Sequence, residues 1–131
     1  LAAKIFLNNL QASILLFLGG ASFGLLTLFI LLVNGVVIGG VLELVREQQG
    51  FLFVAAAILP HGLFEVPSFI IAGSLGLMLA HALYREWFFG EDAAMHALGL
   101  GRKFVTIVVP LLAVASMIEA FITPEIINFV I

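Results

Sequence analysis

A histidine and a glutamate stand in a long apolar part of this chain, where ionisable side chains are costly. His61 and Glu65 lie four residues apart within residues 51–84, and no other ionisable residue occurs there before His81. On a helix this spacing brings both side chains to one face. Moving charged groups out of water costs several kcal/mol unless they find partners. The pair therefore indicates a buried polar centre.

Three further polar residues are candidate partners for this centre. Glu119 is the sole carboxylate of residues 104–122, and Asn34 lies in the middle of the apolar residues 21–45. Asn9 stands in the first apolar segment. A buried amide or carboxylate needs hydrogen-bonding partners. Glu119 could therefore meet His61 and Glu65, or it could reach the membrane interface near the end of its helix. Asn34 could join the same centre or hold two helices together.

The residue types allow three kinds of chemistry at the centre. It could be a structural knot of hydrogen bonds, or a site for an ion, a proton or a small polar solute. It could also be a zinc-dependent hydrolase site with His61, Glu65 and Glu119 as metal ligands. The chain has no His-Glu-x-x-His, no Gly-x-Ser-x-Gly and no phosphate-binding glycine loop. These absences favour a non-enzymatic protein that requires no cofactor, while a metal ion remains possible.

Composition indicates the surroundings of the chain. Of 131 residues, 63% are hydrophobic and only 10% charged, and the mean hydropathy is +1.28, whereas soluble domains carry about a quarter charged residues. We therefore expect a multi-pass integral protein of the cell membrane, in contact with the lipid bilayer. Five Lys and Arg residues and a net charge of -3 argue against nucleic-acid binding. The absence of cysteine excludes disulfides and thiolate metal sites.

The apolar pattern predicts one all-α domain, a polytopic transmembrane helical bundle. Asn8, Asn9 and Gln11 make the first helix amphipathic, so we expect an interfacial helix or the start of a hairpin there. Thr123 and Pro124 have the residue types of an N-cap and a first helical position. The predicted helices comprise residues 1–19, 21–46, 51–59, 63–88, 103–122 and 124–131.

Residues 51–84 are too long for a single straight crossing. As one helix they would extend about 50 Å, against roughly 30 Å of hydrocarbon. Pro60 removes a helix hydrogen bond and Gly62 weakens the next turn, while Pro67 fits the start of a second helix. We therefore predict a broken or re-entrant helix at Pro60–Gly62.

Small residues at helical spacing predict where helices pack closely. They form two stripes, one in each of two long apolar segments, and both glycine pairs of the first stripe match Gly-x-x-x-Gly. Such stripes suit contacts within the bundle and also a homo-oligomer, for which we expect a dimer. The predicted packing residues are Gly20, Gly24, Gly35 and Gly39 in the first stripe, and Ser68, Ala72, Gly76 and Ala80 in the second.

Four elements occur in the order found in a known family. They are Phe6-Leu7-Asn8-Asn9, then Asn34-Gly35, then Leu59-Pro60-His61-Gly62-Leu63-Phe64-Glu65-Val66-Pro67, and finally Ile118-Glu119-Ala120-Phe121-Ile122-Thr123-Pro124. Over nearly its whole length the chain resembles the stage II sporulation protein M family of bacterial and archaeal membrane proteins. The Pro-His-Gly-x-x-Glu element is the most specific part of this resemblance.

The resemblance implies a role in assembly rather than catalysis. The family's namesake acts in engulfment during sporulation, as a membrane anchor in a complex with peptidoglycan-degrading partners. For this chain the resemblance therefore implies a membrane scaffold or assembly partner, with other membrane or cell-wall proteins as possible partners. The alternative is an ion or small-solute channel or transporter that uses the polar centre.

Overall fold

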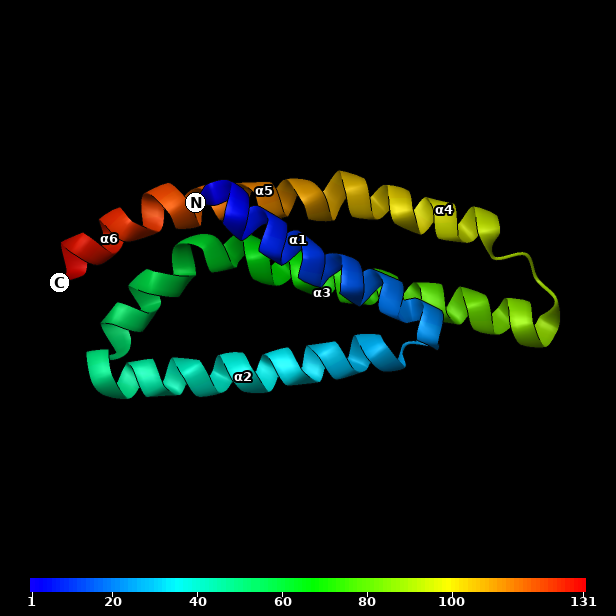
Figure 1. Ribbon diagram of the computed structural model, residues 1–131, viewed down its shortest axis with the longest axis horizontal. Coiled ribbons are helices and arrows are strands. Elements are labelled where there is room, and N and C mark those ends of the chain that lie inside the picture. The colour runs from blue at the N-terminus through cyan, green and yellow to red at the C-terminus, as the bar shows by residue number, and fades with distance from the viewer.

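The computed structural model describes all 131 residues and is a helical bundle without strands. The chain forms four long helical passes, which run back and forth along one long axis (Figure 1). The predicted all-α bundle is confirmed. The passes consist of α1 (Ala2–Leu18) with the short η1 (Gly19–Ser22), then α2 (Leu25–Gln49), then α3 (Phe51–Phe89), and last α4 (Ala94–Lys103), η2 (Phe104–Val108), α5 (Val109–Met117), η3 (Ile118–Ile122) and α6 (Thr123–Val130).

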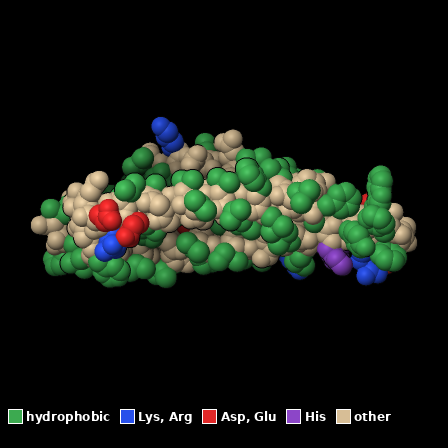
Figure 2. All heavy atoms as spheres, turned by 90° about the horizontal axis from the view of Figure 1, so that it is seen from below, with side chains coloured by type: hydrophobic (Ala, Val, Ile, Leu, Met, Phe, Trp, Pro, Cys, Tyr) green, Lys and Arg blue, Asp and Glu red, His purple; other side chains and the backbone are tan.

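All four passes are long and apolar enough to cross a membrane. By length and composition, the candidate spans are Ala2–Ser22, Leu25–Gln49, Phe51–Phe89 and Ala94–Val130. Figure 2 views the molecule from the side of α2, and charged side chains gather toward the ends of this face while its middle is apolar. Such a distribution fits helices surrounded by lipid, with charges near the two interfaces.

The first helix lies alongside α3 and α5 rather than apart from the bundle. Its buried residues are Asn9, Ser13 and Leu16, which share one helix face. Of the polar residues that made this helix amphipathic, Asn8 and Gln11 are exposed, whereas Asn9 is turned toward the bundle interior. The periodicity predicted an amphipathic helix, either interfacial or the start of a hairpin, and its continuation through η1 into α2 fits the hairpin alternative.

The third helix is continuous from Phe51 to Phe89, with Pro60 and Pro67 inside it. Figure 1 shows that α3 changes direction sharply in its first third and then runs along the bundle antiparallel to α2. A proline in a helix interior removes one hydrogen bond and kinks the helix without ending it. Residues 51–59 and 63–88 thus belong to one bent helix, and an interruption at Pro60–Gly62 stays unconfirmed.

The last pass begins at Ala94, within the residues 89–102 that the predicted helices left out, and contains two π-helical segments, η2 and η3. Pro110 follows the end of η2 by two residues, and Pro124 follows the end of η3 by two residues. The wider π turn relieves the clash between a proline ring and the carbonyl four residues earlier. Consequently η3 continues directly into α6, and Thr123 makes no N-cap hydrogen bond.

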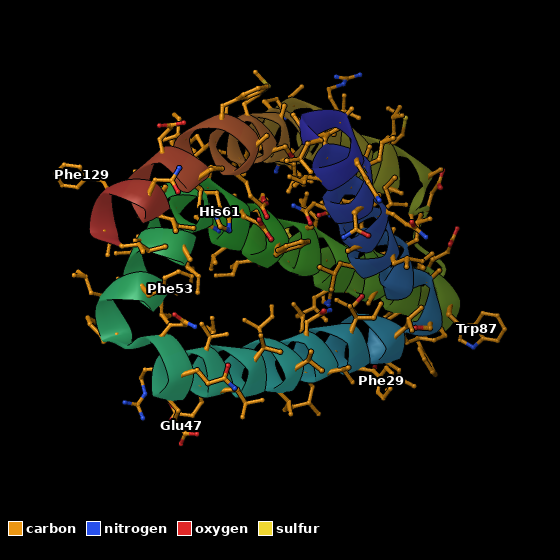
Figure 3. The ribbon with its side chains drawn as sticks, turned by 60° about the vertical axis from the view of Figure 1, so that its left-hand side comes forward. Phe29, Glu47, Phe53, His61, Trp87 and Phe129 are labelled. Carbon is orange, nitrogen blue, oxygen red and sulfur yellow. The ribbon has the colours of Figure 1, made fainter.

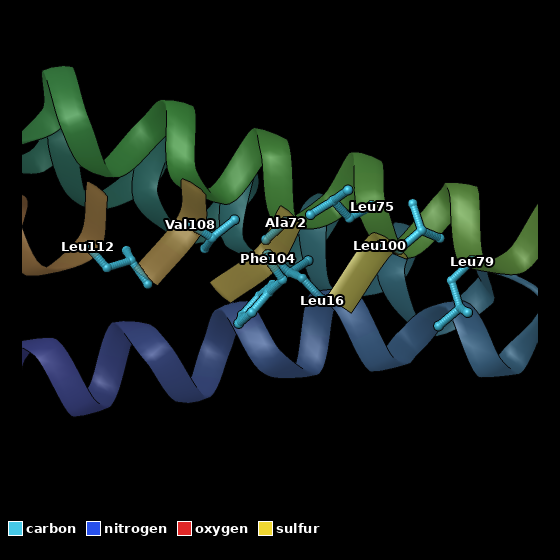
Figure 4. Packing of buried hydrophobic residues seen from close by; sticks show 8 residues of the cluster. All are labelled: Leu16, Ala72, Leu75, Leu79, Leu100, Phe104, Val108 and Leu112. Carbon is cyan, nitrogen blue, oxygen red and sulfur yellow. The ribbon is translucent and has the colours of Figure 1, made fainter. Parts of the chain in front are cut away.

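A continuous apolar core joins the first, third and last passes (Figure 4). The Oγ1 of Thr27 also donates a buried hydrogen bond of 2.7 Å to the carbonyl of Leu16, which fastens the start of α2 to α1. The core therefore fills the bundle between its two ends. Its buried members are Leu16, Ala72, Leu75, Leu79, Leu100, Phe104, Val108 and Leu112.

The two predicted small-residue stripes have different surroundings. On α3, Ser68, Ala72, Gly76 and Ala80 are all buried. A methyl group at Gly20 would collide with the Gly76 carbonyl, and one at Gly24 would touch Leu77 and Ala80. Gly35 and Gly39 on α2 have no atom within 4 Å of such a methyl group. The α3 stripe thus packs within the chain, whereas Gly35 and Gly39 make no close contact in it.

Candidate functional site

The structure brings His61, Glu65 and Glu119 together at one end of the bundle. One potential ligand atom from each side chain lies within 4.8 Å of the others, and all three residues are partly buried. Figure 3 shows His61 directed into the space between the helices, whereas Glu47, Trp87 and Phe129 point outward. We refer to these three residues as the polar centre.

Local helix geometry positions each member of the polar centre. His61 and Glu65 follow Pro60 and lie one turn apart on α3, just after the bend. Glu119 is the second residue of the π-helical η3. A π turn holds one more residue than an α turn and so rotates the side chains that precede it, which is why such turns recur at functional sites. Two proline-induced irregularities, at Pro60 and before Pro124, therefore flank the centre.

Two more polar side chains adjoin the centre. Asn9 on α1 is only 9% exposed, and its amide lies near the Glu65 carboxylate. The Oγ1 of Thr123 lies 3.4 Å from His61 Nδ1. When Nδ1 carries the proton and donates to Thr123, His61 Nε2 is left as the free lone pair. The residue type of Thr123 predicted a helix cap, although its spacing of four from Glu119 placed both side chains on one helix face.

The members of the polar centre approach one another without bonding directly. His61 has one side-chain contact, to Thr123, and the two ion pairs of the structure lie elsewhere, at Glu43–Arg46 and Arg85–Glu91. No Lys or Arg side chain therefore neutralises Glu65 and Glu119. Two carboxylates this close repel each other when both are ionised, and more strongly in an apolar environment. A cation bound between the two carboxylates would relieve this repulsion.

The side chain of Asn34 makes no hydrogen bond to the polar centre. Its Nδ2 donates a hydrogen bond of 2.9 Å to the carbonyl of Ile30, within α2 itself. It also lines a mostly apolar cavity of about 180 Å³ between α1, α2 and α3, together with Gly35 and Phe69. Of the predicted polar partners, the structure thus places Asn9 and Glu119 beside His61 and Glu65, and Asn34 in this separate cavity.

A second polar group lies where α3 meets α4. Arg85 Nε donates a hydrogen bond of 2.7 Å to Glu91 Oε2, and His81, Asp92 and His96 line the same cavity of about 270 Å³. The hydrogen bond from Arg85 lowers the pKa of the Glu91 carboxyl below its ordinary value of 4.5. Both partners are exposed, so the pair contributes little to stability and is weakened by salt.

We expect Glu91→Gln to lower the melting temperature slightly at about pH 7, and more at low salt. Because the folded-state pKa of Glu91 is lowered, the contribution of the pair is fully present above 4.5. It is lost as pH falls through the lowered value, so variant and wild type should converge at an acidic pH below that value. Thermal scans in detergent at both pH values measure this, with Glu86→Gln as control. An equal difference at both pH values would contradict the assignment.

The fold and the site define a polytopic α-helical protein of membrane type, with a polar centre held between helices from opposite ends of the chain. The chain belongs to the family described as Stage II sporulation protein M, whose model matches residues 1–124. It is 31% identical over 137 aligned residues to an uncharacterised protein of Methanocaldococcus jannaschii. That match covers 98% of this chain and 74% of the relative. No solved structure matches the chain.

Proposed function

We propose that this protein is a non-enzymatic scaffold of the cell membrane, in which the polar centre fastens one end of the helical bundle. One observation carries the proposal: His61 and Glu65 on α3 meet Glu119 from the last pass and Asn9 from α1. Three of the four passes are thereby joined at a point beyond the apolar core. Interhelical hydrogen bonds, such as the one that His61 and Thr123 can form at 3.4 Å, help hold membrane helices together where lipid offers no hydrophobic driving force.

The proposed scaffold acts as a homodimer through the exposed flank of α2 that carries Gly35, Gly39 and Gly40, beside the cavity that Gly35 lines. Thr27 is the one buried residue of α2, and Gly35, Gly39 and Gly40 have no atom within 4 Å of an added methyl group. Glycines at this spacing let a second helix approach closely. In a dimer the exposed α2 of one chain would pack against the α2 of a second copy, and other membrane or cell-wall proteins would join this assembly.

Ion or solute handling is the second candidate function, and the unneutralised carboxylates of the polar centre favour it. The centre itself is equipped to hold a cation or protons. Against conduction through one chain stands the core, since Val108 and Leu112 are fully buried between the polar centre and the opposite end of the bundle. A polar path would need to run between two copies. The scaffold function therefore has the stronger support.

Crosslinking in native membranes, compared with ion flux into proteoliposomes, separates these functions. We expect Glu65→Gln and His61→Ala to reduce the amount of assembled protein, because each removes a member of the polar centre. Gly39→Val should reduce crosslinked dimer while the chain still folds. Glu47→Gln, exposed at the end of α2, is the matched control and should change neither. Wild-type flux that Glu65→Gln abolishes, with assembly intact, would overturn the scaffold proposal in favour of transport.

A further inference from the structure

We propose that His61, Glu65 and Glu119 bind one divalent first-row transition-metal ion, with Zn²⁺ and Mn²⁺ as the fitting examples. The ion would link α3 to η3 and thereby tie the third pass to the last. This inference deepens the proposed function and rests on it, because it states how the polar centre fastens the bundle end. Its chemistry, however, can be tested without any assay of assembly.

The separation of the three side chains fits an ion between them. Their ligand atoms lie within 4.8 Å of one another, yet none of the three bonds directly to another. Two ligands of a tetrahedral ion, each at about 2.0–2.2 Å, are roughly 3.4 Å apart. Side-chain adjustments of about 1 Å would therefore bring the three atoms into one coordination sphere. A knot of direct hydrogen bonds would instead have drawn the side chains into contact.

The donor set points to a class of ion. Imidazole suits Zn²⁺ and iron, and carboxylates also accept Mn²⁺, whereas Mg²⁺ prefers oxygen ligands alone. Three protein ligands leave at least one position for water. A divalent cation would also balance the two carboxylates, which have no Lys or Arg partner. The charge and the donor types of the centre thus agree on the same kind of ligand.

The neighbours of the polar centre have the arrangement that supports metal ligands. Thr123 lies at Nδ1 of His61, which would fix the ring and leave Nε2 to face the ion. Asn9, nine-tenths buried, lies near the carboxylate of Glu65 and would hold that carboxylate in place. Metal-bound histidines and carboxylates commonly make such outer hydrogen bonds, and their loss weakens metal affinity about 10–100-fold. Both neighbours come from helices other than the one carrying the ligand, so they orient the ligands independently.

The test is metal binding by the full chain, purified in detergent without a histidine tag and stripped with a chelator. Titration with Zn²⁺ or Mn²⁺ should give one bound ion per chain by elemental analysis and raise the melting temperature, whereas Mg²⁺ should do neither. We expect His61→Ala, Glu65→Gln and Glu119→Gln each to weaken binding about tenfold or more. Thr123→Val should weaken it less. The control His96→Ala, at the opposite end of the bundle, should bind as wild type does.

Circular dichroism shows whether each variant retains its helices, and the conservative Glu65→Asp provides a folded variant if the others do not. No binding by wild type, or equal binding by the three ligand variants, would overturn the metal site. Binding lost in His96→Ala instead would also overturn it. If the ion binds as expected while Glu65→Gln still assembles in membranes, the metal site stands and the scaffold function fails. If assembly depends on Glu65 but no ion binds, the scaffold function stands and the metal site fails.

Discussion

Gly76→Val is expected to destabilise the bundle by about 1–3 kcal/mol or more, as overpacking of a close contact does. A methyl group at Gly76 would collide with the carbonyl of Leu16 and press against Thr27 Oγ1 at 3.0 Å. Neither the backbone of α1 nor the hydrogen bond from Thr27 to that carbonyl can yield without separating α1, α2 and α3. Because three helices meet at this glycine, the change should loosen all three contacts at once.

The measurement is the melting temperature of the purified protein in detergent, followed by tryptophan fluorescence or circular dichroism. Gly99→Val is the matched control, because Gly99 is also helical and has no atom within 4 Å of an added methyl group. Both variants replace a helical glycine by valine and so change helix propensity alike. The difference between their melting temperatures therefore reports the collision at Gly76. Equal melting temperatures for both would show that α1 and α3 do not approach as closely at Gly76 as the structure places them.

The small-residue stripe of α3 illustrates what periodicity can and cannot predict. Residues spaced by four on α3 identified a face that packs, and the cost of burying His61 and Glu65 placed these side chains on the inner side of the bundle. The same spacing on α2 gave an equally good pattern, yet a methyl group added at Gly35 or Gly39 would have no atom of the chain within 4 Å. A stripe of small residues predicts that another helix can approach closely. Which helix does so follows only from the packing of the whole bundle.

The residues of the polar centre could be predicted from the sequence, but their arrangement in space could not. His61 and Glu65 are local neighbours, so helical spacing was sufficient for them. The place of Glu119 beside them depends on how the last pass lies against α3 and on the π turn that precedes Pro124. Asn9 was ambiguous for another reason, because an amphipathic helix can turn its polar face to water or to a buried polar group. Single-sequence patterns do not distinguish these two surroundings.

Leu112→Ala is the second large effect, with an expected loss of about 2–5 kcal/mol for a buried leucine. Leu112 is fully buried in the core, and its carbonyl accepts a hydrogen bond of 2.7 Å from Ser116 Oγ. Since lipid tails are as apolar as leucine, the loss comes from van der Waals contacts around the new cavity rather than from transfer out of water. The value should therefore lie toward the lower end of that range.

Met117→Ala is the matched control, because Met117 lies on the same helix, has a similar volume and is 54% exposed. Detergent or lipid can fill the space left there, so the melting temperature of Met117→Ala should stay near that of wild type.

The comparison of Leu112→Ala with wild type also bears on the polar centre, because Leu112 lies two turns before Glu119 on the last pass. If Leu112→Ala lowers both the melting temperature and the affinity for Zn²⁺, the core positions the ligands. If it lowers the melting temperature alone, the bend of α3 and the π turn of η3 position them without the core.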